Sequence, residues 1–322
     1  MSLTSAVVGL GRVGIGYDIN LPKKQFVLSH ARALEVCPGT KLIAGVDNSE
    51  DRISLFKEIY KVPAFKSISD FLGEVRPDLI VISTPTVTLT DVAKEILDTY
   101  TPFGILIEKP ISVDFPSALK LVERCENQGT ELFVNYTRRS SLAFREVKNR
   151  ILDGTFQGPF IGTAWYTNGI LNNGSHLLNI LEYLFGGVEN FSRVKMFADR
   201  GADFDLGLTV KFSECEINFQ PLPKENFFIF RFELYGANGI LTLENGFEGF
   251  TWKHLQEESG HSDSNGLSDR VIRIPSDMKM AQLHVIDSLI KAVRGLPESI
   301  CTGREGLKTL EYINTFVKSL RS

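Results

Sequence analysis

The chain has 322 residues, a formal net charge of -4 and 43% hydrophobic residues, the balance of an ordinary globular protein. Its length exceeds what one hydrophobic core usually organises, so two domains are expected. No basic cluster occurs, which argues against a nucleic-acid partner. No apolar run reaches the roughly 18 residues of a membrane span.

The four cysteines lie far apart without CxxC spacing, so free buried thiols are expected rather than a disulfide framework or a metal site. The segment from Met1 to Leu10 lacks the basic and longer apolar regions of a signal peptide. Together these features predict a cytoplasmic protein that binds no metal and does not enter a membrane.

The first part of the chain alternates short apolar runs with helical patterns. The runs occupy residues 6–9, 41–46, 79–83 and 104–107, and the helical patterns residues 31–36, 50–59, 69–75 and 91–100. Nearly continuous apolar runs are typical of parallel strands covered on both faces. An α/β fold is therefore predicted, with a doubly wound parallel Rossmann sheet in an N-terminal domain, residues 1–130.

Beyond about residue 135 the pattern changes. Helical segments are expected at residues 144–152, 176–185 and 281–320, and runs of period two at residues 193–197, 206–212, 215–219 and 227–235. In the last run, Phe228, Phe230, Phe232 and Leu234 share one face. We expect a C-terminal α/β domain, residues 131–322, with an open, mostly antiparallel sheet, and a polar loop at residues 253–270.

A glycine-rich turn, Gly9-Leu-Gly11-Arg-Val-Gly14, follows the first expected strand directly. Gly9 permits a tight turn, Gly11 lets the backbone approach a pyrophosphate, and Gly14 permits close packing of helix and strand. With Arg12 and Val13 between them, these residues are predicted to bind a dinucleotide.

Asp47 ends the second expected strand, where a carboxylate can accept hydrogen bonds from the ribose hydroxyls. Arg52 is the nearest cation in sequence, so a 2′-phosphate would meet a carboxylate without an adjacent arginine, and NAD is favoured over NADP. Asp47 lies 33 positions after Gly14, against roughly 20 in the usual unit. An insertion at residues 15–29 explains the excess; it either helps choose the substrate or is a solvated loop.

Several elements in chain order resemble the Gfo/Idh/MocA oxidoreductase family. They are the glycine-rich turn, Ser83-Thr84-Pro85, Glu108-Lys109-Pro110 after an apolar strand, Gly174-Ser175-His176, and Cys301-Thr-Gly-Arg-Glu-Gly306. Members are NAD(P)-dependent enzymes that oxidise or reduce sugars, polyols and nucleotide-linked sugars. The resemblance implies such an enzyme here, acting on a sugar that is plain or nucleotide-linked.

The resemblance also implies where the chemistry lies. Thr84 and Pro85 would line the nicotinamide half of the cleft, beside Glu108, and Lys109 would face the reacting carbon. Oxidation of a secondary alcohol requires the hydroxyl proton to leave as the hydride leaves carbon. A lysine can stabilise the developing alkoxide or take that proton, so Lys109 is the first catalytic candidate.

His176 is the second catalytic candidate. It stands with Asn172, Asn179 and Tyr183 at spacings of three and four, in the first turn of an expected helix. The positive end of a helix favours the neutral imidazole of a proton acceptor. Many family members carry Asp where this chain has Asn172 and Asn179. These amides can hold sugar hydroxyls but supply no charge, which argues against a polyol dehydrogenase of the inositol type.

Two further residues are candidates for binding the substrate. Arg138 and Arg139, in Asn135-Tyr-Thr-Arg-Arg139, match a basic pair near the family's cleft, and one of them, Arg138 in the first place, could contact a phosphate or carboxylate; a plain salt bridge is the alternative. Tyr17 lies in the insertion. Because the family's open sheet often forms a dimer interface, a homodimer or homotetramer through the C-terminal sheet is implied.

Two other functions stay open at this point. One is an NAD-binding regulator or scaffold without turnover, which the amides at positions 172 and 179 would fit. The other is net transfer between two aldoses with a cofactor that is never released. Retention of both Lys109 and His176 favours the dehydrogenase.

Overall fold

The computed structural model describes residues 2–201, 203–223, 228–246, 248–255 and 266–320. It divides into two compact units: unit 1 comprises Met1–Ser141 and Lys279–Leu310, and unit 2 comprises Leu142–Met278 and Glu311–Ser322. The sequence predicted a division at residue 130 instead. That division would remove β6 (Glu131–Val134) from the sheet in which it pairs with β5 (Gly104–Ile107).

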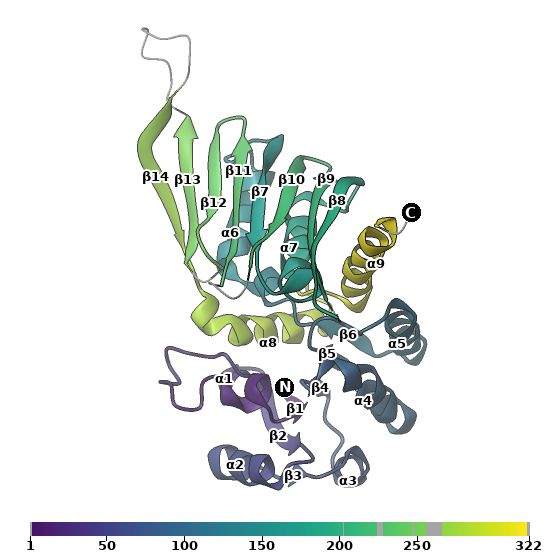
Figure 1. Cartoon of the computed structure of the whole chain (residues 1–322). Coiled ribbons are helices and arrows are strands. Elements are labelled where there is room, and N and C mark those ends of the chain that lie inside the picture. The colour runs from purple at the N-terminus through teal and green to yellow at the C-terminus, as the bar shows by residue number, and fades with distance from the viewer. Residues whose placement is uncertain (1, 202, 224–227, 247, 256–265, 321–322) are drawn as a thin grey trace. The chain divides into compact units, whose positions relative to one another are not determined.

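Unit 1 contains a six-stranded parallel sheet in the order β3-β2-β1-β4-β5-β6 (Figure 1). The other strands are β1 (Leu3–Val8), β2 (Thr40–Val46), β3 (Ala64–Phe65) and β4 (Leu79–Ile82). The sheet grows outward from β1 in both directions, which is the doubly wound order predicted from the apolar runs. β4 and β5 are buried along their whole length, as expected of strands with both faces covered.

Helices α1 to α5 of unit 1 alternate with its strands, and α8 joins the unit from a later part of the chain. They are α1 (His30–Val36), α2 (Glu50–Tyr60), α3 (Ile68–Glu74), α4 (Thr86–Thr99), α5 (Phe115–Gln128) and α8 (Ala281–Ala292), with the short turns η1 (Arg12–Gly16) and η2 (Thr137–Ser140). Helix α5 was not predicted from the sequence, although both of its ends carry signals. The Asp114 carboxylate accepts a hydrogen bond from the Ser117 N–H at 2.9 Å, and Gly129 closes the helix at a φ of 73°.

Residues 281–320, expected to be helical, form α8 and α9 (Gly303–Ser319), which are separated by an irregular segment. α8 belongs to unit 1, not to the C-terminal unit as the predicted domains had it. Its apolar side chains, including Ile286 and Leu289, share one buried core with Val7 of β1 and Leu34 of α1. The division between the units falls inside α9, after Leu310.

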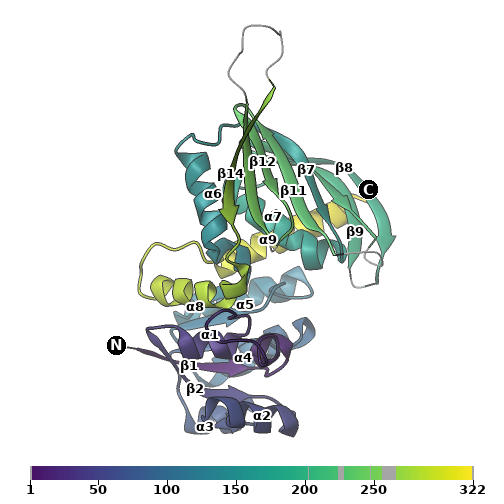
Figure 2. The same cartoon turned by 90° about the vertical axis from the view of Figure 1, so that its left-hand side faces the viewer.

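Unit 2 contains an eight-stranded sheet in the order β14-β13-β12-β11-β7-β10-β9-β8 (Figures 1 and 2). The strands are β7 (Phe160–Tyr166), β8 (Asn190–Asp199), β9 (Phe204–Phe212), β10 (Cys215–Pro221), β11 (Phe230–Gly236), β12 (Gly239–Leu243), β13 (Gly249–Leu255) and β14 (Leu267–Pro275). Neighbouring strands are antiparallel except β10 and β7, which are parallel. The predicted fold class, an open and mostly antiparallel second sheet, is confirmed.

Helices α6 (Leu142–Leu152) and α7 (Ser175–Phe185) contribute to the core of unit 2 together with one face of this sheet. Phe230, Phe232 and Leu234 are 0% exposed there. The aromatic face of β11 is therefore part of the core of the unit itself, so it is not available as a surface for a partner subunit. Phe228 lies before the strand and is 43% exposed, and Phe227, part of the same predicted run, lies outside the described residues.

The polar stretch at residues 253–270 was expected to be a loop, but its ends are strands. Lys253 of β13 pairs with Val271 of β14, and Leu255 pairs with Leu267. Residues 256–265 lie outside the described part of the chain. Within the described residues, no helix has both the length and the apolar character needed to cross a bilayer.

Candidate active site

A cleft of about 880 Å³ opens in unit 1 where β1, β2, β4 and β5 end. Ligand pockets commonly have about 300–1,000 Å³, so the cleft can hold a dinucleotide-sized molecule. It lies beside β1, where the strand order reverses and where open α/β sheets bind their ligands. The predicted site residues that line it are Gly9, Gly11, Arg12, Val13, Tyr17, Asp47, Thr84, Pro85, Glu108 and Lys109.

The glycine-rich turn has the shape that its residues require. Gly9 has a φ of +94°, and a Cβ there would lie 2.7 Å from the carbonyl carbon of Ser83, so only glycine fits. A Cβ on Gly14 would collide with the carbonyl of Gly9. Around Gly11 the nearest atom to such a Cβ is Arg52 Nη1 at 3.9 Å. The backbone at Gly11 is thus open to the cleft, as a pyrophosphate-binding turn needs.

The insertion alters the backbone immediately after this turn. The chain makes one short π-helical turn, η1, instead of a long helix, and α1 begins only at His30. The N–H groups of Ile15 and Gly16 both bond back to the carbonyl of Gly11. The turn can therefore donate hydrogen bonds to a ligand from local N–H groups, but it provides little of the positive dipole that the N-terminus of a full helix would add.

Asp47 follows β2 and is 8% exposed. Its Oδ2 accepts a hydrogen bond from the Leu10 N–H at 2.7 Å, and its Oδ1 accepts one from the Ser49 N–H at 2.9 Å. The carboxylate thus fixes the glycine-rich turn and keeps lone pairs for ribose hydroxyls. Arg52 Nη1 lies 3.5 Å from Asp47 Oδ2 and lines the cleft, which corrects the expectation that no arginine is adjacent.

Glu108 and Lys109 follow β5 and both line the cleft. Glu108 Oε1 lies 2.7 Å from His30 Nε2 and accepts a hydrogen bond from Asn135 Nδ2 at 2.7 Å. The sequence analysis assigned His30 and Asn135 no role, because nothing local in the sequence links them to Glu108. The Lys109–Pro110 peptide bond is cis.

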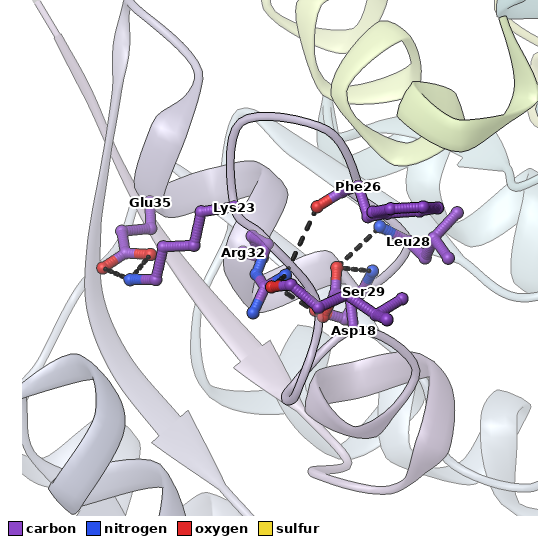
Figure 3. Close-up of polar contacts among 8 residues, drawn as sticks. Asp18, Lys23, Phe26, Leu28, Ser29, Arg32 and Glu35 are labelled. Atoms are coloured by element: carbon purple, nitrogen blue, oxygen red, sulfur yellow. Dashed lines mark hydrogen bonds and ion pairs between the residues drawn. The ribbon is translucent and has the colours of Figure 1, made fainter.

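The insertion is an ordered loop closed by one buried carboxylate (Figure 3). Asp18 is 0% exposed and accepts hydrogen bonds from the Leu28 N–H at 2.6 Å, the Ser29 N–H at 2.9 Å and the Ser29 hydroxyl at 2.6 Å. Arg32 Nη1 donates to carbonyls within the loop, those of Leu21 and Phe26. The loop is therefore more than a solvated connection.

Of the insertion's polar residues, Tyr17 is the one that lines the cleft. Tyr17 is 46% exposed, and the Arg12 guanidinium carbon lies 5.2 Å from its ring centroid. Lys23 pairs instead with Glu35 at 2.8 Å on the exposed surface (Figure 3). Asp18 holds the loop together, and Tyr17 remains the candidate for contact with a ligand.

His176, Asn172 and Asn179 all lie in unit 2. The π-helical turn η3 (Gly169–Gly174), which contains Asn172, runs directly into α7, which contains His176 and Asn179. His176 is thus preceded by helical backbone, so the positive helix end lies further away than the sequence predicted. Asn179 is 1% exposed, and Asn172 is exposed.

The backbone of this turn contacts a carboxylate that the sequence analysis missed. Asp203, just before β9, accepts hydrogen bonds from the Leu171 N–H at 2.8 Å and from the Asn172 N–H at 3.0 Å. Burial raises the pKa of Asp203, although these backbone hydrogen bonds oppose the rise. A carboxyl group therefore does stand next to position 172, supplied from a distant segment of the chain.

The basic pair in η2 is divided between two environments. Arg139 forms an ion pair with Glu305, which is the plain salt bridge that the sequence left as an alternative. Arg138 is 6% exposed, and burial lowers its pKa to about 9, so its cation still dominates at neutral pH. Arg138 does not line the cleft. The described residues contain no cluster of three side chains that could hold a metal ion.

Comparison with known proteins relates the nucleotide-binding part of the chain to a family. Residues 3–136 match the GFO_IDH_MocA profile, described as an oxidoreductase family with an NAD-binding Rossmann fold. The myo-inositol 2-dehydrogenase of Thermotoga maritima is 24% identical over 156 residues, which make up 48% of this chain and 42% of that protein. The match therefore spans less than half the length of this relative.

Solved structures extend the likeness of fold over nearly the whole chain. The WlbA dehydrogenase from Bordetella pertussis, in complex with NADH and UDP-GlcNAcA, has a TM-score of 0.75 at 19% identity, over 99% of this chain and 96% of that one. The aldose-aldose oxidoreductase from Caulobacter crescentus has a TM-score of 0.76 at 18% identity, over 100% and 98% of the two chains. The part of the chain that matches the family model, residues 3–136, is thus similar to the nucleotide-binding domain of the Gfo/Idh/MocA family of NAD-binding oxidoreductases.

Proposed function

We propose that the chain is an NAD-dependent oxidoreductase that transfers a hydride between the nicotinamide and a secondary alcohol or ketone of a nucleotide-linked sugar. The observation that carries the proposal is that one cleft brings together the glycine-rich turn, Asp47 and Lys109. The first two fit a dinucleotide, and Lys109 adds a group that can manage a proton. When bound, NAD supplies the hydride acceptor.

On this proposal, the cofactor is held by residues of unit 1. They are Gly9, Gly11, Arg12, Val13, Gly14, Asp47, Thr84, Pro85, Glu108 and Lys109. Gly14 contributes by allowing the turn to pack on Gly9, since it does not itself line the cleft. The Asp47 carboxylate accepts hydrogen bonds from the ribose hydroxyls. It uses the oxygen lone pairs that are not occupied by the N–H groups of Leu10 and Ser49.

The proton is handled by Lys109 and His176. Lys109 stabilises the developing alkoxide charge, and the His176 imidazole accepts the hydroxyl proton. Asn172 and Asn179 hold sugar hydroxyls, and Tyr17 contacts the part of the substrate that carries the nucleotide. Arg138, which is buried and does not line the cleft, is not assigned to this contact. A nucleotide-linked sugar is supported by the ligand in the WlbA complex and by the cationic, aromatic pair of Arg12 and Tyr17 in the cleft.

The test is reduction of NAD by the purified protein when it is offered a panel of UDP-linked sugars and, for comparison, free aldoses and inositols. Wild-type protein should form NADH with at least one UDP-sugar, and Lys109→Met should lower kcat by about 100-fold or more. Lys94→Met, on α4 and outside the cleft, is the matched control and should keep wild-type turnover.

Other results would identify another function. NAD binding without turnover on the whole panel would indicate a regulator or scaffold. Turnover with inositol alone would contradict the nucleotide-linked substrate. NAD that stays bound through purification, with exchange between two aldoses, would indicate aldose–aldose transfer.

We further propose that the protein is cytoplasmic and forms a homo-oligomer through the sheet of unit 2. The four cysteines are free and buried, as in a reducing compartment. On the sheet face opposite the core, Ile161 is 64% exposed and Tyr235 is 53% exposed. Light scattering of the Ile161→Asp variant should give a smaller mass than the wild type, and an unchanged mass would refute this interface.

A further inference from the structure

A buried histidine outside the proposed catalytic set holds the carboxylate next to Lys109. His30, the first residue of α1, is 0% exposed, and its Nε2 lies 2.7 Å from Glu108 Oε1. Asn135 Nδ2 donates to the same oxygen at 2.7 Å and lies 3.4 Å from Gln282 Oε1 of α8. Two segments far apart in sequence therefore meet at the Glu108 carboxylate, and a third, α8, contacts one of them through Gln282.

Both partners of this contact have a fixed backbone. The Glu108 N–H donates to the carbonyl of Ile82 at 3.1 Å, which continues the pairing of β5 with β4. Ser29, just before His30, is held by Asp18 through its N–H and its hydroxyl. Because the backbone on each side is tied down, the side chains meet without rearrangement, as in a preorganised site.

The protonation states follow from the surroundings of Glu108. Burial alone would raise the pKa of this carboxyl, but the hydrogen bond and charge of His30, the Asn135 amide and the Lys109 charge together lower it below its ordinary value. Glu108 is therefore ionised at neutral pH and can only accept hydrogen bonds. It follows that His30 carries a proton on Nε2 and donates it to Glu108.

The second ring nitrogen of His30 supports this assignment. His30 Nδ1 is buried and has no hydrogen-bond partner among the described residues. A buried N–H without an acceptor is destabilising, so the neutral ring favours the tautomer with its proton on Nε2. The titratable groups that act on Glu108 in the described structure are His30 from α1 and Lys109 from its own loop, while Asn135 contacts it as an uncharged amide.

We propose that His30 is a positioning residue that keeps the Glu108 carboxylate ionised and fixed, and that this carboxylate in turn holds the Lys109 ammonium at the cleft. The two residues are adjacent in sequence, line the same cleft, and interact through their charges. The inference rests on the proposed role of Lys109, and it adds a residue that touches neither cofactor nor substrate.

The first test is independent of turnover. Long-range ¹H–¹⁵N NMR of protein labelled on its five histidines reports which ring nitrogen carries the proton. The His30 signals, assigned by their loss in His30→Gln, should show a proton on Nε2 at neutral pH. A neutral ring protonated on Nδ1 would overturn the proposal, because such a ring cannot donate to Glu108.

The second test compares His30→Leu, which removes the donor, with His30→Gln, whose amide can replace it. With the UDP-sugar that gives turnover, His30→Leu should lower kcat about 10- to 100-fold and leave the Kd for NADH within about threefold of wild type. The acidic limb of its pH–kcat profile should move up by about one pH unit. The reason is that the His30 hydrogen bond no longer counteracts the rise that burial causes in the Glu108 pKa. His30→Gln should restore most of the wild-type kcat and most of the wild-type acidic limb.

The control is Thr40→Val, which removes the buried Thr40–Ser5 hydroxyl contact in the same sheet, away from the cleft. It should keep the wild-type kcat and pH profile. An unchanged kcat and acidic limb in His30→Leu, or the same loss in Thr40→Val, would refute the role of His30. If Lys109→Met retains full turnover, the proposed catalytic role of Lys109 fails; if only His30→Leu is unaffected, the further inference alone fails.

Discussion

Replacement of Asp18 by alanine tests whether the insertion is held as a preorganised loop. Its buried carboxylate accepts three hydrogen bonds, two from the N–H groups of Leu28 and Ser29 and one from the Ser29 hydroxyl. Arg32 Nε also lies 3.6 Å from Asp18 Oδ1, and the Arg32 side chain is 3% exposed. Removing the carboxylate would leave these donors and a buried cation without their acceptor.

The magnitude follows from burial. A buried donor that loses its acceptor costs about 1–3 kcal/mol, and breaking a buried ion pair by removing one partner costs about 3–5 kcal/mol. Since these contacts share one side chain, their energies do not add, and we expect Asp18→Ala to lose about 3–5 kcal/mol of unfolding free energy. Asp18→Asn keeps the shape and one strong acceptor, so about 1–2 kcal/mol is expected.

The assay is urea unfolding followed by circular dichroism, with Glu35→Gln, which removes an exposed contact between α1 and the same loop, as the control. That variant breaks the exposed Lys23–Glu35 pair, which should contribute about 0–1 kcal/mol. The reasoning would be refuted if Asp18→Ala and Glu35→Gln lost the same free energy, because burial would then not decide the strength of the contact.

Three further predictions concern the cleft. Asp47→Ala should raise the Kd for NAD, measured by calorimetry, about 10- to 100-fold. It should also narrow the preference for NAD over NADP, because Arg52 then lacks its carboxylate partner and can face a 2′-phosphate. An unchanged Kd for NAD would contradict the assigned role. Gly9→Ala should lose about 3 kcal/mol or more, because its Cβ would meet the Ser83 backbone at a positive φ; an unchanged Tm would show that the turn adapts. The Glu108 carboxyl has a lowered pKa, so its ionised form stabilises the fold at neutral pH and loses that effect as the pH falls below its ordinary value of 4.5. Glu108→Gln should accordingly reduce the unfolding free energy more at pH 7 than near pH 4, and an equal loss at both would rule this out.

The parts that could be predicted from sequence are those with local causes. Gly9 and Gly14 are required by contacts within one turn, and continuous apolar runs identified the buried parallel strands. Asp47 could be placed because a strand end and a carboxylate coincide there. The family resemblance added Lys109, which no local pattern would separate from a surface lysine.

The parts that could not be predicted depend on contacts between distant residues. α8 packs on the first sheet because its apolar face complements that core, a match that periodicity alone does not assign to either unit. The pairing of His30 with Glu108 joins residues 78 positions apart. For the same reason, Arg52 was judged remote from Asp47, although one turn of α2 brings its guanidinium to the carboxylate.

The same limit explains the aromatic strand. Alternation showed that Phe230, Phe232 and Leu234 share a face, and this is how β11 is built. It could not show which partner covers that face. In the structure this face lies in the core of the same unit, because Leu177 and Leu181 of α7 share that core with these side chains.

The most direct test of the central claim is transfer of label from substrate to cofactor. Purified protein would be incubated with NAD and UDP-sugars deuterated at every carbon of the sugar, and the recovered cofactor would be analysed by mass spectrometry. A hydride transfer predicts reduced cofactor that carries one deuterium, formed by the wild type and lost in Lys109→Met. Recovered NAD without deuterium, from protein shown by calorimetry to bind it, would contradict the assignment of this cleft as the site of an oxidoreductase.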